Sequence, residues 1–190
     1  LFEIFGNFVF EWKQIIIFIS ISSMVVGALA AIVQDNIKRL LAYSSIGHIG
    51  YILIGFASFS ELGIRSIIIY LSIYIAMNVG IFAILLSLKS NNKYIERISS
   101  LSGLSKSNPI VSFVLAIMMF SMAAIPPFAG FFAKFYIFVA AIESNLFFLA
   151  LIGVLTSVVA AFYYIRIVKI MYFDQLKNSF ELNINHKAKI

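Results

Sequence analysis

The chain alternates between long apolar runs and short polar segments. The runs are about 20 residues or longer, the length at which a helix crosses about 30 Å of hydrocarbon. This pattern predicts five membrane spans, at about residues 14–33, 37–59, 64–88, 110–142 and 146–170. We therefore expect an all-α integral membrane protein with a pre-membrane segment (residues 1–13), a five-helix membrane domain (residues 14–173) and a polar C-terminal tail (residues 174–190).

The fourth run is too long for one helix. Residues 110–142 would extend about 50 Å as a helix, against about 30 Å of hydrocarbon. Pro126 and Pro127 lie inside the run, and each lacks an N–H group and clashes with the preceding turn. The sequence therefore predicts a helix broken at these prolines, with halves at 110–125 and 128–142. Broken helices at membrane depth typically line a site or a water-filled path.

Composition and charge agree with a membrane protein. Of the 190 residues, 62% are hydrophobic and 12% charged, far from the usage of soluble domains. The net charge of +6 is spread over segments between the apolar runs, so membrane topology explains it better than nucleic-acid binding does. The chain has no cysteine, which excludes disulfides and thiolate metal sites.

The basic residues favour one side of the membrane. The side holding the first and third connections and the tail carries Lys38, Arg39, Lys89, Lys93, Arg97, Lys106, Arg166, Lys169, Lys177, Lys187 and Lys189. The other side holds only Lys13 and Arg65. By the positive-inside rule, the basic side faces the cytoplasm or, in a mitochondrion, the matrix. The remaining basic residue, Lys134, belongs to neither side.

Lys134 lies inside the second half of the broken helix. Its helical neighbours, Gly130, Phe131, Ile137 and Phe138, offer no acceptor for its side chain, so its partner must be water or another helix. A charged lysine at this depth is costly and marks a functional site. We interpret Lys134 as a proton-transfer group. The alternative is a side chain that reaches the headgroups, although about eight residues of the half-helix still follow it.

The second span carries a candidate proton relay. At 100° per residue, Ser44, His48, Tyr51, Gly55 and Ser58 fall in one stripe about 80° wide. Hydroxyl groups around an imidazole can support a hydrogen-bonded water chain, which makes Ser44, His48 and Tyr51 candidates for proton transfer. The alternative is hydrogen bonding between helices with no role in transport.

Other polar and small residues are expected to pack helices together. These residues are Ser66, Tyr70, Tyr74 and Asn78 in span three and Ser23, Gly27 and Ala31 in span one. Span five carries Thr156, Tyr163 and Tyr164 near its middle. Arg166 and Lys169 are expected to reach the membrane surface.

The sequence lacks the motifs of soluble catalysis. It has no glycine-rich phosphate loop and no nucleophile elbow, and its two histidines, His48 and His186, lie in different environments. The acidic residues fall at span ends or in loops. We therefore expect no redox chemistry, no cofactor and no metal in this chain.

Two segments carry a resemblance. "QDNIKRLLAYSSIGHIGY" (residues 34–51) and "AIPPFAGFFAKFY" (residues 124–136) resemble the antiporter-like subunits of respiratory complex I, the proton-pumping NADH:ubiquinone oxidoreductase. The wording "SSIGHIGY" and the lysine in "GFFAKF" most resemble subunit 2, since subunit 4 usually has glutamate at this place. The resemblance extends over roughly residues 1–173.

The resemblance implies a fold and roles. The family has two inverted repeats of five helices, each with a broken helix, and the spans here correspond to the second repeat. Lys134 would be the broken-helix lysine of the proton path, and His48 would border its hydrated axis. Pro126, Pro127 and Gly130 would shape the break. Flavin and iron–sulfur clusters would belong to partner subunits.

The resemblance also implies missing parts. The glutamate and two lysines of the first repeat have no counterpart, so we expect half of a proton path. A split subunit is favoured over a fragment as the explanation. Expected partners are a separate chain carrying the N-terminal half, other membrane-arm subunits and lipids, but no nucleic acid. The expected location is the mitochondrial inner membrane, with the basic loops and tail in the matrix. The alternatives are a multi-subunit Na⁺/H⁺ antiporter subunit and a non-transporting structural piece.

Overall fold

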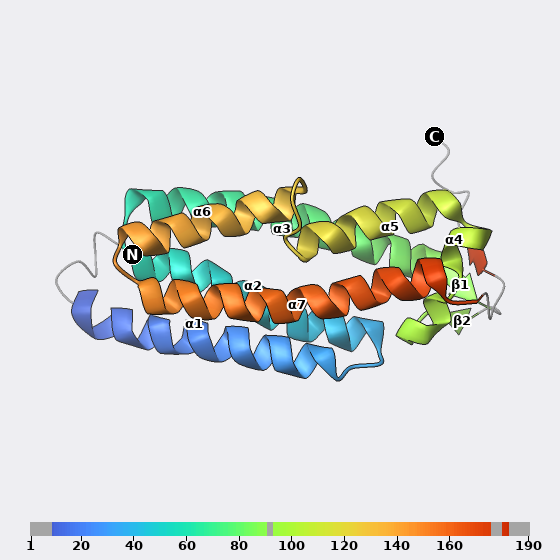
Figure 1. Ribbon diagram of the computed structural model, residues 1–190, viewed down its shortest axis with the longest axis horizontal. Coiled ribbons are helices and arrows are strands. Elements are labelled where there is room, and N and C mark those ends of the chain that lie inside the picture. The colour runs from blue at the N-terminus through green and yellow to red at the C-terminus, as the bar shows by residue number, and fades with distance from the viewer. Residues whose placement is uncertain (1–8, 91–92, 176–179, 183–190) are drawn as a thin grey trace.

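The computed structural model describes residues 9–90, 93–175 and 180–182, and it is a bundle of long helices lying side by side (Figure 1). The long helices are α1 (Val9–Ile32), α2 (Ile37–Ser58), α3 (Glu61–Ser87), α5 (Pro109–Met122), α6 (Ala129–Glu143) and α7 (Phe147–Phe173). Within the described residues, four of these, α1, α2, α3 and α7, are long and apolar enough to cross a membrane. The shorter α5 and α6 follow one another along the bundle, so the five-helix prediction with a broken fourth helix is confirmed.

A group of short elements lies at one end of the bundle, where Figure 1 shows β1, β2 and α4. It consists of β1 (Leu88–Ser90), β2 (Lys93–Tyr94), the 3-10 helix η2 (Ile98–Leu101), α4 (Leu104–Ser107) and β3 (Phe180–Leu182). The strands form an antiparallel sheet in the order β2-β1-β3. The sequence pattern did not predict this sheet. In it, β3, which belongs to the expected tail, pairs with β1, the strand that directly follows α3.

Side-chain caps explain where two helices begin. The Asn36 side chain accepts hydrogen bonds from the backbone N–H groups of Lys38 and Arg39, at 3.0 and 3.1 Å, and so begins α2. The Ser60 hydroxyl accepts from the N–H of Gly63 at 3.0 Å, so α3 begins at Glu61, three residues before the predicted span. The described part of α1 also includes Val9, ahead of the expected start at residue 14.

The break between α5 and α6 occupies residues 123–128 and includes the Pro126–Pro127 pair, joined by a cis peptide bond. The first half-helix ends at Met122, three residues earlier than expected, because Ala124 already has a left-handed conformation with φ of 58°. Across the break, the N–H of Gly130 donates to the Ser121 hydroxyl at 2.9 Å. A Cβ atom on Gly130 would lie 1.8 Å from the Ser121 carbonyl oxygen, so the close approach requires glycine here.

The helices α1 and α2 pack closely along the small-residue face that the sequence indicates. A Cβ atom on Gly27 would lie 2.5 Å from the backbone nitrogen of Gly47. On the same interface, the Ser20 hydroxyl donates to the Gly50 carbonyl at 2.7 Å. Small residues thus bring the two backbones together, as in other membrane helix pairs.

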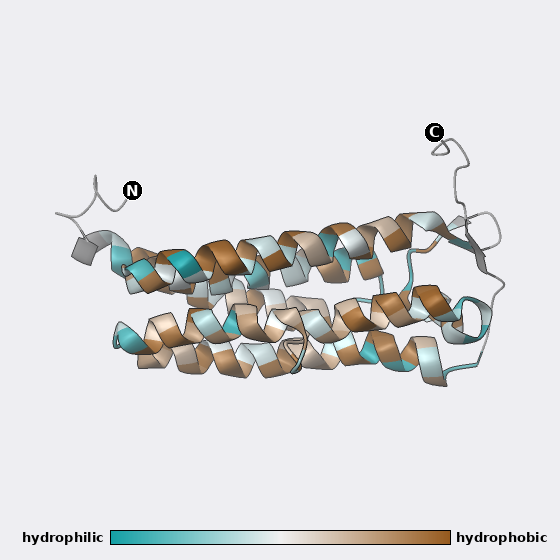
Figure 2. Ribbon diagram, turned by 90° about the horizontal axis from the view of Figure 1, so that it is seen from above, coloured by the Kyte–Doolittle hydropathy of each residue, from teal (hydrophilic) through white to brown (hydrophobic). Residues whose placement is uncertain are grey.

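Apolar side chains cover the outer faces of the helices. Figure 2 shows hydrophobic residues along the lengths of the helices and hydrophilic ones concentrated toward their ends. Phe18, Phe113, Val158 and Phe162 are more than half exposed, as expected for positions that face lipid. The buried polar residues include His48 and Lys134, both 4% exposed, and these two mark the candidate site.

Candidate functional site

Four buried polar side chains from three helices form one hydrogen-bonded chain. The Ser44 hydroxyl on α2 is hydrogen-bonded to the Tyr164 hydroxyl on α7. That phenol oxygen lies 3.1 Å from Nε2 of His48, and Nδ1 of His48 lies 2.7 Å from the Tyr70 hydroxyl on α3. All four residues are buried. The chain thus crosses from α7 through α2 to α3, and we refer to it as the His48 chain.

The groups of the His48 chain can pass a proton along it. Each hydroxyl can both donate and accept, and a neutral imidazole donates from one nitrogen while it accepts at the other. A proton that enters at one end can therefore leave at the other if the imidazole changes tautomer. Both ring nitrogens of His48 are engaged by tyrosines, so His48 has no ring nitrogen left for a direct bond to Lys134.

Lys134 is buried on α6, one turn after the break. Its Nζ atom donates to the Ser157 hydroxyl on α7 at 3.1 Å and lies 4.6 Å from the centre of the Tyr51 ring on α2. The ion pairs found within residues 9–90 and 93–175 join Arg65 to Glu61, Arg166 to Asp35 and Lys169 to Asp174. Lys134 takes part in none of them, so a hydroxyl and an aromatic face hold its amine in place of a carboxylate.

A small cavity lies between the His48 chain and Lys134. It is lined by His48, Tyr70, Tyr74, Met77, Ser121, Met122, Gly130, Ala133 and Lys134. Its volume of about 10 Å³ is close to the least that holds one water molecule. Ser121 and Met122 come from one side of the helix break and Gly130 from the other, so the break opens the space that separates His48 from Lys134.

The structure brings together most of the residues that the sequence singles out. Ser44 and His48 belong to one hydrogen-bonded chain, and Tyr51 lies against Lys134. Ser58 does not join them, because its hydroxyl donates to the Gly55 carbonyl of its own helix at 2.7 Å. His186 lies outside the described residues.

The sequence pattern indicated helix packing alone for Tyr70 and missed Ser157. Tyr70 does join two helices, and its hydroxyl is also one end of the His48 chain. Ser157 was not singled out, although it accepts the hydrogen bond from Lys134. The four-residue spacing of Tyr70 and Tyr74 indicates a polar face on α3, and nothing in the sequence near Ser157 indicates its partner.

Arg166 was expected to reach the surface, and its guanidinium lies 3.1 Å from a carboxylate oxygen of Asp35.

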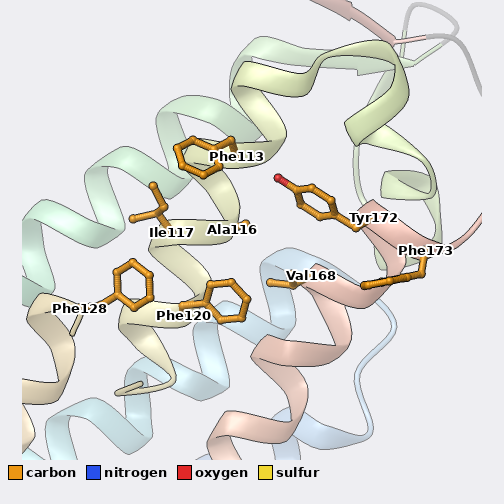
Figure 3. Close-up of a pocket in the computed structure, with 8 residues that line it drawn as sticks. All are labelled: Phe113, Ala116, Ile117, Phe120, Phe128, Val168, Tyr172 and Phe173. Carbon is orange, nitrogen blue, oxygen red and sulfur yellow. The ribbon is translucent and has the colours of Figure 1, made fainter. Parts of the chain in front are cut away.

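A second, larger hollow lies apart from these groups, on the outer face between α5 and α7 (Figure 3). Its volume is about 460 Å³, and its lining residues are Phe113, Ala116, Ile117, Phe120, Phe128, Val168, Tyr172 and Phe173. The Tyr172 hydroxyl is the single polar side-chain group of this lining, so this hollow, which we refer to as the apolar groove, offers no path for protons. Among the described residues, no group of three or more His, Cys, Asp or Glu residues could hold a metal ion.

Known proteins are similar to this chain in both sequence and fold. A family described as "NADH:quinone oxidoreductase/Mrp antiporter, TM" matches residues 1–160. The chain is 55% identical to NADH-quinone oxidoreductase subunit N of Paramagnetospirillum magneticum over 177 residues, which are 93% of this chain and 36% of that protein. This relative is bacterial and is named subunit N, whereas the resemblance pointed to subunit 2.

Two solved structures resemble the bundle. Respiratory complex I from Thermus thermophilus contains a chain with a TM-score of 0.78 and 28% identity, covering 88% of this chain and 38% of that one. The Mrp complex from Dietzia sp. contains a chain with a TM-score of 0.76 and 27% identity, covering 87% of this chain and 31% of that one. This chain thus spans little more than a third of the length of the subunit N relative and of the complex I chain.

Proposed function

Because this chain belongs to the NADH:quinone oxidoreductase/Mrp antiporter transmembrane family, we propose that it contributes half of a proton path to the membrane arm of a proton-pumping NADH:quinone oxidoreductase. The observation that carries the proposal is the buried Lys134 beside a helix break, separated from the His48 chain by a cavity for one water. A buried lysine without a carboxylate partner destabilises the folded protein when it is charged, and a role in proton transport accounts for its presence here.

The geometry supports distinct roles for the two parts of the site. The His48 chain receives protons near Ser44 and carries them toward the cavity. A water there passes them to Lys134, which lies on the side of the break that leads away from the basic loops. Lys134 then releases its proton toward the opposite membrane face when charges in neighbouring subunits change. No step of this sequence is a redox reaction, and flavin and iron–sulfur clusters belong to partner subunits.

We propose that this chain takes the position of subunit N, which we equate with subunit 2 of the mitochondrial enzyme. The glutamate and two lysines of the first repeat would come from a separate chain that carries the N-terminal half. Further partners are the other membrane-arm subunits and lipids. The location that we propose is the mitochondrial inner membrane, with the basic end of the bundle in the matrix. Lys38 in the first turn of α2, Lys89 in β1 and Lys106 in α4 belong to this end.

Substitution of Lys134 in the complex tests this function. Lys134→Ala is expected to leave the complex assembled and to lower the rate of proton translocation at least about tenfold, because loss of a positioned proton-transfer group costs about 10²- to 10⁴-fold in rate. Phe132→Ala, an exposed residue on the same helix, is the matched control. Proton translocation by Lys134→Ala equal to that of the control would refute the proposal.

The similarity to the Mrp complex supports a second candidate, a subunit of a multi-subunit Na⁺/H⁺ antiporter, because its TM-score of 0.76 is close to 0.78 for complex I. The 55% identity to an oxidoreductase subunit favours the first candidate. Purification of the native complex distinguishes them. NADH oxidation and flavin in the purified band support the oxidoreductase, and Na⁺-dependent proton exchange without NADH oxidation supports the antiporter.

A further inference from the structure

The Tyr51 hydroxyl donates a hydrogen bond to a neighbouring helix. The Tyr51 oxygen lies 3.1 Å from Oγ1 of Thr156 on α7. The Thr156 hydroxyl lies 2.9 Å from the carbonyl oxygen of Ile152 and 3.1 Å from that of Gly153, so its own proton points to the backbone of its helix. Thr156 must then accept from Tyr51, because a hydroxyl has one proton to donate.

This hydrogen bond, together with ring packing, fixes the orientation of the Tyr51 ring. The rings of His48 and Phe138 each pack edge-on against it, with centroids 6.2 Å away. The face of the ring lies against Nζ of Lys134, 4.6 Å from the ring centroid. An ammonium over an aromatic face at this distance is attracted by the ring quadrupole, most strongly where water is excluded.

The next residue of α7 completes the arrangement. Ser157 follows Thr156 directly, and its hydroxyl accepts the hydrogen bond from Lys134 at 3.1 Å. One turn of α7 thus fixes both the ring and the amine that lies over it. Neither contact carries a negative charge, so together they stabilise the ammonium less than a buried carboxylate would.

We propose that Tyr51, Thr156 and Ser157 are positioning residues that hold the protonated amine of Lys134, and that Tyr51 acts through its ring face rather than through its hydroxyl. This inference rests on the proposed role of Lys134 in proton transfer. A carboxylate partner would keep the proton on the lysine, whereas a hydroxyl and a ring hold the ammonium in place and still let it release its proton.

Two substitutions of Tyr51 separate this inference from a relay through its hydroxyl. Tyr51→Phe keeps the aromatic face, with the rings of His48 and Phe138 still packed against it, and removes the hydroxyl that Thr156 orients. Proton translocation should therefore continue, with the alkaline limb of its pH profile moved to lower pH by less than in Tyr51→Leu. Tyr51→Leu removes the face, so the ammonium loses an attraction that the neutral amine does not have. The alkaline limb of the translocation profile should then move by about one pH unit to lower pH. Tyr136→Leu, a 40% exposed tyrosine on α6, is the control.

Substitution of Ser157 offers an independent test, because it removes only a hydroxyl group. Ser157→Ala removes the acceptor of the Lys134 hydrogen bond and should move the same limb to lower pH by about one pH unit, since hydrogen bonds to charged groups are the stronger ones. Ser157→Thr keeps a hydroxyl and should restore the wild-type profile. Ser72→Ala, an exposed serine on α3 with a hydroxyl bonded to its own helix, is the matched control.

The outcomes distinguish the inference from the proposed function. The measurement is proton uptake into vesicles containing the purified complex, divided by NADH oxidation, from about pH 6 to about pH 9, a range that covers the alkaline limb on both sides of a shift of about one unit. Wild-type profiles for both Tyr51→Leu and Ser157→Ala, alongside inactive Lys134→Ala, would overturn the inference alone. Loss of translocation in Tyr51→Phe would also overturn it and would assign the hydroxyl to the relay. Normal translocation by Lys134→Ala would overturn both the inference and the proposed function.

Discussion

The Tyr70 hydroxyl lies 2.7 Å from Nδ1 of His48, within the buried part of the bundle. The contact joins α3 to α2 and occupies the second ring nitrogen of an imidazole whose first nitrogen is held by Tyr164. Since the two tyrosines hold opposite edges of the ring, they fix its orientation and require that a proton passing through His48 enter from one phenol and leave by the other.

Tyr70→Phe removes the last hydroxyl of the His48 chain and keeps the aromatic ring in place. If protons pass along this chain, the rate of proton translocation is expected to fall at least about tenfold while the complex still assembles, because a lost proton-transfer group costs about 10²- to 10⁴-fold in rate. The measurement is proton uptake into vesicles containing the purified complex. Tyr172→Phe removes a hydroxyl from the apolar groove between α5 and α7 and should have no effect. Equal translocation by the two variants would show that the His48 chain is structural.

His48→Leu should destabilise the bundle. The substitution leaves the Tyr70 hydroxyl without its hydrogen-bond partner on α2 and removes one of the partners of the Tyr164 hydroxyl. A buried polar group that loses its partner costs about 1–3 kcal/mol. Heating of the purified complex, followed by native electrophoresis, should release this chain at a lower temperature than in wild type. His48→Gln, which can still donate and accept, is expected to recover part of the loss, and no difference between the variants would contradict this account.

Gly130→Ala should disrupt the helix break. Its Cβ atom would lie 1.8 Å from the Ser121 carbonyl oxygen, and the nearest atoms are backbone, which cannot rotate away. We expect a destabilisation of at least about 2 kcal/mol, as for other overpacked sites, and poor recovery of assembled complex. Ser121→Ala removes only the hydroxyl that accepts from the Gly130 N–H, so it should be milder. Normal assembly of Gly130→Ala would show that the two half-helices can move apart.

The contact between α1 and α2 predicts opposite effects at two helical glycines. A Cβ atom on Gly27 would lie 2.5 Å from the backbone of Gly47, so Gly27→Ala should push the helices apart and cost about 1–3 kcal/mol. A Cβ atom on Gly47 would meet no atom within 4 Å, so Gly47→Ala should be neutral or stabilising by up to about 1 kcal/mol. Thermal release of the chain from the complex compares the two, and equal effects would contradict the packing described here.

Local patterns predicted much of the candidate site. The length of the apolar run from residue 110 to 142 and its prolines indicated a broken helix, and the structure has the break at residues 123–128. The helical period placed Ser44, His48 and Tyr51 on one face of α2, and all three are buried. The exact end of α5 could not be predicted, because it depends on the left-handed turn at Ala124 and not on the prolines alone.

The sequence by itself determined that this is a membrane protein, that its fourth span is broken, and that Lys134 has no partner on its own helix. These conclusions follow from length, hydropathy and helical period, all of which act within one segment. Only the tertiary structure decided that Ser157 and Tyr51 hold Lys134 and that Tyr70 and Tyr164 hold His48. The reason is that a helical period gives a face along one helix, whereas the depth and rotation of one helix against another are set by packing such as that of Gly27 on Gly47.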